Sequence, residues 1–100
     1  MQHHTSFPAN KDEAEALAVT ALSAIAADPK LLSRFMALTG IEPQNLRHAA
    51  SEPGFLTSVT NFLMTDESTL VAFAANEGLR PESVARAHAF LSGPEAQFGE

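Results

Sequence analysis

The sequence predicts an all-α protein, a compact six-helix bundle made of two tandem three-helix repeats. Apolar residues recur at spacings of three and four, and no stretch alternates with period two for long enough to form a strand. Pro and Gly fall between the periodic segments, where they begin and end helices. The chain also resembles itself with a period of about 38 residues, which lies within the range of helical repeats.

Composition bounds the class of protein. At 100 residues the chain has the length of one domain, and 45% hydrophobic residues supply one core. Alanine is abundant and seven Phe stand without Trp or Tyr, so we expect helices that approach closely through small residues. The absence of cysteine excludes disulfides, thiolate metal sites and a cysteine nucleophile. Without a membrane-spanning run or a signal segment, we expect a cytoplasmic protein.

The first half of the chain reads as a tail followed by three helices. Residues 1–9 show no periodicity and are expected to form a flexible tail. The helix boundaries are marked by Asn10 with Glu13 as a capping box, Asp28-Pro29, Gly40 and Pro43. The apolar positions are Leu17, Ala18, Ala21, Leu22 and Ile25 in the first helix, Leu31, Leu32, Phe35 and Leu38 in the second, and Leu46, Ala49 and Ala50 in the third.

The second half repeats this order. A helix starts at Pro53, Asp66 caps the next one, and Gly78 and Pro81 separate it from the last, which stops at Gly93-Pro94. The apolar positions are Phe55, Leu56, Val59, Phe62 and Leu63, then Leu70, Phe73 and Ala74, then Val84, Ala87 and Leu91. We therefore expect one helical domain over residues 10–93 and a C-terminal tail over residues 94–100.

An ungapped shift that places Asp28 on Asp66 defines the two repeats, residues 12–50 and 51–91. It gives seven identities over the 24 positions from Asp28 to Ser51. The alternative is convergence, because Gly and Pro recur at helix ends in any helical protein. Duplication is favoured because Phe35 falls on Phe73 in the same register. The residues expected to anchor the core are Leu32, Phe35, Phe55, Phe62, Leu70 and Phe73.

The segment from Asp28 to Gly40, with Arg34-Phe35 as its most specific part, resembles a family of short all-helical bacterial proteins catalogued only as a domain of unknown function. The segment Glu52-Pro53-Gly54-Phe55-Leu56, continuing to Ala75, resembles it too. The likeness runs from about Asp12 to Leu91. It implies the helical fold and a bacterial cytoplasmic protein, and it brings no activity, ligand or catalytic residue.

Three groups of residues are candidate sites. Four positively charged or titratable residues of the first repeat have different residues in the second, and they are a candidate binding surface: Lys30, Arg34, Arg47 and His48. The alternative is helix faces that drifted in solvent. His3 could hold Cu(II) or Ni(II) with the terminal amine and two amide nitrogens. The spacing of Ala74, Gly78 and Val84 is that of a helix-turn-helix, within residues 70–91.

Charge and missing motifs decide among function classes. The net charge is −6, and it is concentrated in the second half, which disfavours nucleic acid and anionic membranes as partners. No phosphate loop, zinc-protease motif or nucleophile elbow occurs, so we expect neither an enzyme nor a cofactor. The sequence favours a non-enzymatic protein–protein interaction module that binds an unknown protein or itself. The alternatives are a DNA-binding regulator and a small-ligand or metal-binding protein.

Overall fold

A computed structural model of the chain describes residues 7–52 and 54–98, with the backbone alone for residues 94–98. Within these residues the chain forms six α-helices and one 3₁₀ turn, and it forms no strand. The elements are α1 (Lys11–Ala26), α2 (Pro29–Thr39), η2 (Pro43–Asn45), α3 (Leu46–Ala50), α4 (Phe55–Met64), α5 (Glu67–Glu77) and α6 (Pro81–Phe98). The all-α class is confirmed.

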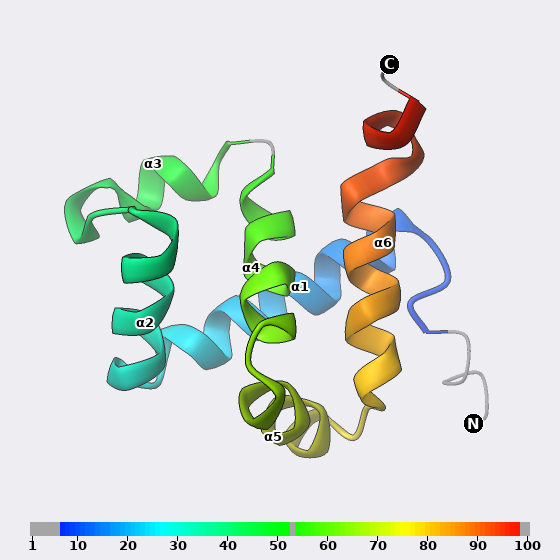
Figure 1. The fold of residues 1–100 in the computed structure, drawn as a ribbon, viewed down its shortest axis with the longest axis horizontal. Helices are drawn as coiled ribbons and strands as arrows, with labels where there is room; N and C mark the ends of the chain where they lie inside the picture. Colours follow the sequence, from blue (N-terminus) through cyan, green and yellow to red (C-terminus); the bar gives the residue numbers. More distant parts are fainter. Residues whose placement is uncertain (1–6, 53, 99–100) are drawn as a thin grey trace.

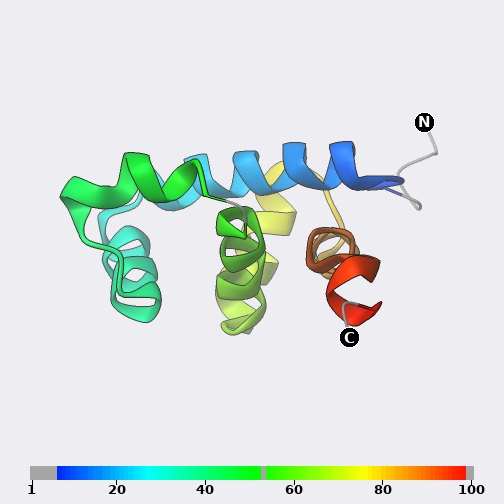
Figure 2. The same cartoon turned by 90° about the horizontal axis from the view of Figure 1, so that it is seen from above.

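The helices form two layers. In Figure 1, α1 runs behind α2, α4 and α6, which stand across it. Figure 2 shows α1 along one side and these three helices beneath it as separate columns. The fold is flat, with extents of 40 × 36 × 19 Å. Helix α1 packs against all three of these helices, and α4, in the middle, packs against α1, α2, α3, α5 and α6.

Local signals set the helix ends. Asn10 Oδ1 accepts a hydrogen bond from the Glu13 amide at 2.8 Å and begins α1. Asp28 does the same for α2, accepting from the Lys30 amide at 3.0 Å. At their other ends, α2 and α5 stop at Gly40 (φ 77°) and Gly78 (φ 68°), a left-handed conformation that favours glycine.

The core combines an alanine-rich face of α1 with phenylalanines from the columns. The α1 residues Ala14, Ala18 and Ala21 are fully buried, which leaves room for other helices to approach. The Phe35 ring is also fully buried, and it meets the Phe55 and Phe62 rings edge to face at centroid distances of 5.9 and 5.4 Å. Of the other expected anchors, Phe73 is buried, while Leu32 and Leu70 are half-buried against the core.

Residues 7–9 differ from the expected flexible tail. Pro8 is fully buried, and Phe7 packs against the core. The backbone is held at two points: the Pro8 carbonyl accepts from Arg86 Nε at 2.7 Å, and the Ala9 amide donates to Glu13 Oε1 at 2.7 Å. The contacts of Phe7 and Pro8 join segments that are distant in the sequence, so local periodicity gave no sign of them.

Three further expectations need correction or refinement. The expected apolar face of α2 included Leu38, yet Leu38 is 57% exposed, so the described residues leave this part of the face largely uncovered. The fourth helix begins at Phe55, after Gly54 in a left-handed conformation (φ 91°), and Pro53 lies outside the described residues. The last helix ends at Gly93 as expected, because its φ of 78° and ψ of 147° are not helical. After this kink, residues 94–98, which were expected in a C-terminal tail, form a second short helical segment.

The two repeats are matched in part. Helices α2 and α5 have the same length, and the shift that places Asp28 on Asp66 also superimposes their bounds. By contrast, α1 has 16 residues where α4 has 10, and α3 has five where α6 has 18. Helix α6 packs along α4, but its counterpart α3 packs against α4 and η2. The division into two equivalent units therefore stays a prediction.

Within the described ranges, no single helix has both the length and the apolar content to cross a bilayer. Only α1 and α2 taken together reach that content, and they are bent by 114° at their junction.

Candidate functional site

The face made by α2 and α4 is hollowed along its length. A hollow of about 560 Å³ lies between α2 and the end of α4, and one of about 390 Å³ lies among α2, α3 and α4; Leu38 lines both. We call them together the α2–α4 groove. Its apolar lining consists of Ala37, Leu38, Ile41, Ala49, Phe55 and Phe62; Arg34 and Asp66 lie in one hollow, and Glu52 lies in the other.

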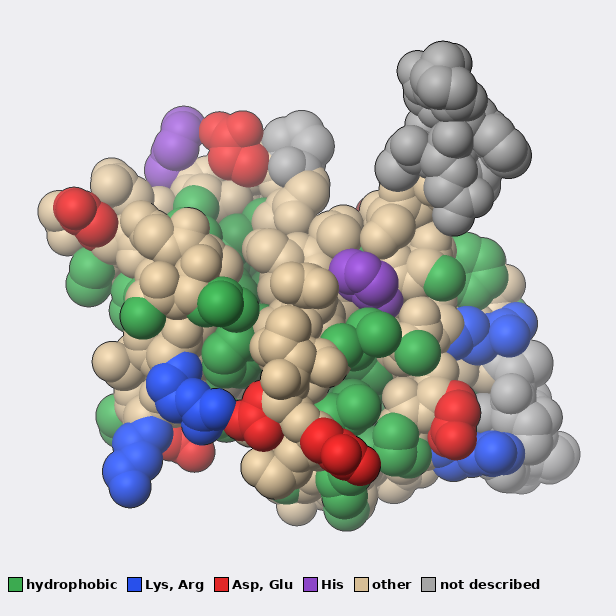
Figure 3. Space-filling model, viewed as in Figure 1, with side chains coloured by type: hydrophobic (Ala, Val, Ile, Leu, Met, Phe, Trp, Pro, Cys, Tyr) green, Lys and Arg blue, Asp and Glu red, His purple; other side chains and the backbone are tan. Residues whose placement is uncertain are grey.

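Leu38 is the exposed apolar residue at the centre of this groove. It is more exposed than Val19, Val71 or Met64, the other large hydrophobic residues at the described surface. Beneath it the groove rests on Phe55 and Phe62, which are held in the aromatic core. Figure 3 shows apolar side chains reaching the surface over α2 and α4, above a group of basic ones. The groove thus joins a rigid floor to an uncovered leucine.

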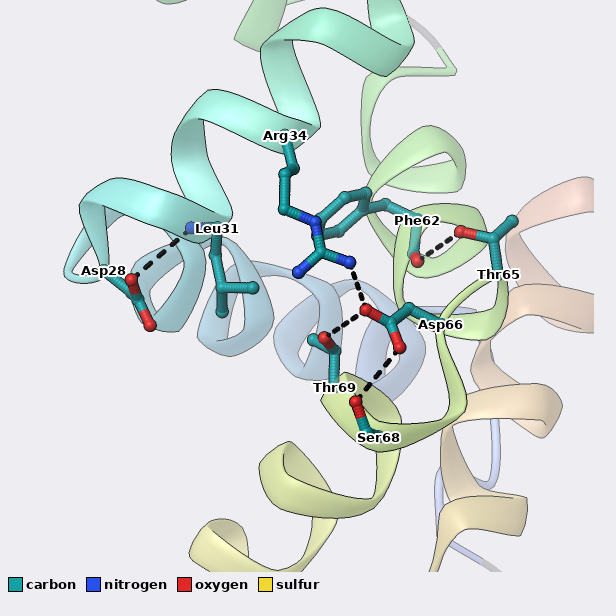
Figure 4. A network of polar contacts seen from close by, with 8 residues as sticks. All are labelled: Asp28, Leu31, Arg34, Phe62, Thr65, Asp66, Ser68 and Thr69. Carbon is teal, nitrogen blue, oxygen red and sulfur yellow. Dashed lines mark hydrogen bonds and ion pairs between the residues drawn. The ribbon is translucent and has the colours of Figure 1, made fainter.

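An ion pair closes one end of the groove. Arg34 Nη2 donates to Asp66 Oδ2, joining the middle of α2 to the residue that precedes α5 (Figure 4). Thr69 Oγ1 donates to the same carboxylate at 2.9 Å, and Ser68 Oγ donates at 3.2 Å. The hydrogen bond from Thr69, followed by that from Arg34, lowers the pKa of Asp66 from 3.8 to about 2.

This lowered pKa predicts a pH dependence of stability. The folded state holds the Asp66 carboxylate more tightly in its ionised form than the unfolded state does, so the contribution is present above pH 4. It is lost as the pH falls from about 4 through about 2. We expect the urea midpoint of the wild type to fall more steeply over this window than that of Asp66→Asn, which keeps the size of the side chain and removes the carboxylate that titrates. Parallel curves for the two proteins would contradict this role.

The four residues of the expected binding surface do not form one patch. Lys30 and Arg34 lie on α2, and Arg34 is engaged with Asp66. Arg47 and His48 lie on the short α3 beyond the far end of α2 (Figure 1). His48 Nε2 lies 3.1 Å from Glu52 Oε2. Intramolecular contacts thus occupy two members of the set, and Lys30 and Arg47 are exposed on different helices.

The corner between α5 and α6 has the packing that its spacing predicts. Ala74 and Val84 are buried on either side of Gly78. The arginines of α6 and of the turn before it contact their own chain, however. Arg80 Nε lies 3.7 Å from Glu82, and Arg86 binds the Pro8 carbonyl with its guanidinium 5.8 Å from the centroid of a phenylalanine ring. The contacts of Arg86 join α6 to the N-terminal segment, whereas Arg80 makes only an exposed pair with its near neighbour in the sequence.

The histidines His3 and His88 lie in different parts of the chain. His88 Nδ1 lies 2.8 Å from the hydroxyl of Thr60, a fully buried residue of α4, so this histidine joins α6 to α4. His3 lies outside the described residues. Among the residues that the structure does describe, no three His, Asp or Glu side chains gather in a way that could hold a metal ion.

Sequence reasoning missed the groove itself. Leu38 is predicted on the apolar face of α2, and the spacing of residues carries no sign of an uncovered side. Asp66 is expected as a helix cap. It stands at the N-cap position of α5, but its side chain makes no capping hydrogen bond and accepts instead from the side chains of Arg34, Thr69 and Ser68. The signal that pointed here was indirect: Arg34 differs from Ala72, its counterpart in the second repeat.

Comparison with known proteins adds a family and no activity. The model of a family described as a protein of unknown function, DUF3572, matches residues 11–94, which is most of the chain. No curated protein matches the chain. No solved structure matches it either.

Proposed function

The chain belongs to the DUF3572 family of proteins of unknown function, and from that premise we propose that it is a non-enzymatic protein–protein interaction module. The observation that carries the proposal is the exposure of Leu38 above the buried floor of the α2–α4 groove. The resemblance to short bacterial proteins supports a bacterial, cytoplasmic setting for this role.

A groove between two helices suits an amphipathic helix of a partner. Such a helix lays its apolar stripe between the two columns and covers the exposed side chain. Burying Leu38 removes apolar surface from water, which is the main favourable contribution to association. The aromatic residues below are already packed, so the floor needs no rearrangement to receive the partner.

The proposed contact is mainly apolar. Self-association is an alternative form of this module, through a contact between a basic surface of one copy and an acidic surface of another. Arg34 already pairs with Asp66 inside the chain, and His48 lies against Glu52, so fewer charges are available for that contact. The apolar groove supports a complex that depends little on salt, because screening acts on charges and not on buried apolar area.

Position-specific photo-crosslinking in the native host tests this function. A photoreactive residue at position 38 is expected to give a discrete cross-linked product, and one at position 19 is expected to give none. Val19 is a matched control because it is 51% exposed on α1. In purified form, Leu38→Asp should weaken the captured complex by roughly tenfold or more, while Val19→Asp leaves it unchanged. A homodimer or a heterodimer linked through position 38 supports the module, and equal labelling at both positions overturns it.

A further inference from the structure

Another hollow, separate from the α2–α4 groove, lies where α1, α2 and α5 meet. It has a volume of about 360 Å³, and we call it the α1–α5 hollow. Its floor is apolar, formed by Ile25, Leu63 and Phe73, all of which are buried. Leu31 projects beside it in Figure 4, with Thr69 and Ser68 across the gap. Arg34, one turn beyond Leu31 on α2, belongs to the other groove.

The hollow lies where the alignment of the two repeats places a second pair like Arg34–Asp66. The acidic member of this second pair is present, but the basic member is not. Arg34 on α2 reaches Asp66, the residue at the N-cap position of α5. In the second repeat the counterpart of Arg34 is residue 72 on α5, and the counterpart of Asp66 is Asp28, at the N-cap position of α2. Both line the α1–α5 hollow, but residue 72 is an alanine. The space that an arginine side chain would fill is therefore open, beside a carboxylate.

The polar rim offers acceptors and carries negative charge. Asp28 Oδ1 accepts from the amides of Lys30 and Leu31, and within the described residues Oδ2 accepts no hydrogen bond. Ser68 and Thr69 direct their hydroxyl hydrogens to Asp66, so only their lone pairs remain for the hollow. Glu77 adds a second carboxylate, and no Lys, Arg or His among the described residues lines the site. Asn76 also lines the hollow, and its amide group can both donate and accept. The charged groups at the rim, Asp28 and Glu77, are both negative, so the hollow favours a ligand that brings positive charge.

We propose that the α1–α5 hollow binds a guanidinium cation on a short aliphatic chain. The guanidinium donates to Asp28 and to the oxygens of Thr69 and Ser68, in the place of the missing arginine. Its methylene groups lie on the apolar floor, where water is displaced. This planar group has five donors and matches a carboxylate better than an ammonium does. The site is independent of the interaction module proposed above.

Nuclear magnetic resonance titration with N-propylguanidinium, the side chain of arginine from its β-carbon outward, tests the site. Saturable shifts are expected for the amides of Ala24, Ala72 and Asn76. Two matched probes isolate the charge: N-propylurea, a neutral compound of the same shape, and butyrate, an anion. Both are expected to leave these amides unmoved. A second titration uses a capped peptide that contains one arginine. It distinguishes a free guanidinium compound from a partner's arginine side chain as the natural ligand, and binding of either cation supports the site.

Matched variants locate the binding. Ala72→Arg should supply the missing cation from within and abolish binding, whereas Ala75→Arg adds the same charge at an exposed position outside the hollow and should leave it intact. Asp28→Asn keeps a capping side chain and should weaken binding roughly tenfold or more, since it removes a charged acceptor. Asp12→Asn, with the same loss of charge on α1, should not. Equal effects within either pair, equal binding of propylurea, or no saturable shift would overturn the proposal.

Discussion

Replacing Phe35 with alanine is expected to lower the free energy of unfolding by about 3–5 kcal/mol. The Phe35 ring is fully buried, and it contacts the rings of Phe55 and Phe62 at favourable edge-to-face angles. It thereby fixes α2 to α4. Domains of this size are stable by about 5–15 kcal/mol, so the change takes a large share of the total. Urea denaturation followed by circular dichroism measures it.

Two controls make this result specific. Phe35→Leu keeps part of the volume and should lose less stability than Phe35→Ala. Val19→Ala removes an exposed apolar side chain and should stay within about 0.5 kcal/mol of the wild type. A loss below about 1 kcal/mol for Phe35→Ala would mean that the aromatic cluster does not hold α2 in place.

Enlarging Ala87 to leucine is expected to cost about 1–3 kcal/mol. Ala87 is fully buried on α6, the helix that packs along both α1 and α4. The facing side of α1 is made largely of alanines, so the helices lie close together and extra methyl groups have no space. Thermal unfolding of the purified variant gives the loss as a lower midpoint.

The comparison for this variant is Ala89→Leu, further along α6. Ala89 is exposed, so the same added volume meets solvent and stability should change by no more than about 0.5 kcal/mol. Equal losses at the two positions would show that helix propensity, and not the close approach of α6, accounts for the effect.

Helix boundaries were largely predictable because their causes are local. Asn10 with Glu13, Asp28 and the two glycines at helix ends act within a few residues of their own position. Residues 7–9 are predicted to be part of a flexible tail because they show no periodicity. In the structure the Pro8 carbonyl accepts from Arg86, which lies far away in the sequence, and a local pattern cannot show such a contact. Periodicity shows which residues share a helix face. It does not show which part of that face another helix covers, and so the exposure of Leu38 on the apolar face of α2 could not be predicted.

The sequence predicted part of the site, through a difference between the two repeats. Only the fold shows what the residues at these positions contact. Arg34 was notable because Ala72 stands at its counterpart. In the structure Arg34 serves as an internal partner of Asp66, and the alanine leaves the α1–α5 hollow open. The four residues that differ between the repeats are predicted to form one binding surface, although they lie on two separate helices, α2 and α3. Whether two matched positions face the same neighbour depends on packing, and packing here is not the same in the two halves.

The packing of α1 against α6 also bears on the order of synthesis. A ribosome makes α1 first and α6 last, yet these two helices are close neighbours in the fold. Helices α2 and α4 can cover part of α1 early, but the part that packs on α6 stays uncovered until α6 has left the exit tunnel. Until then this part of α1 is a surface that chaperones and other nascent chains can reach.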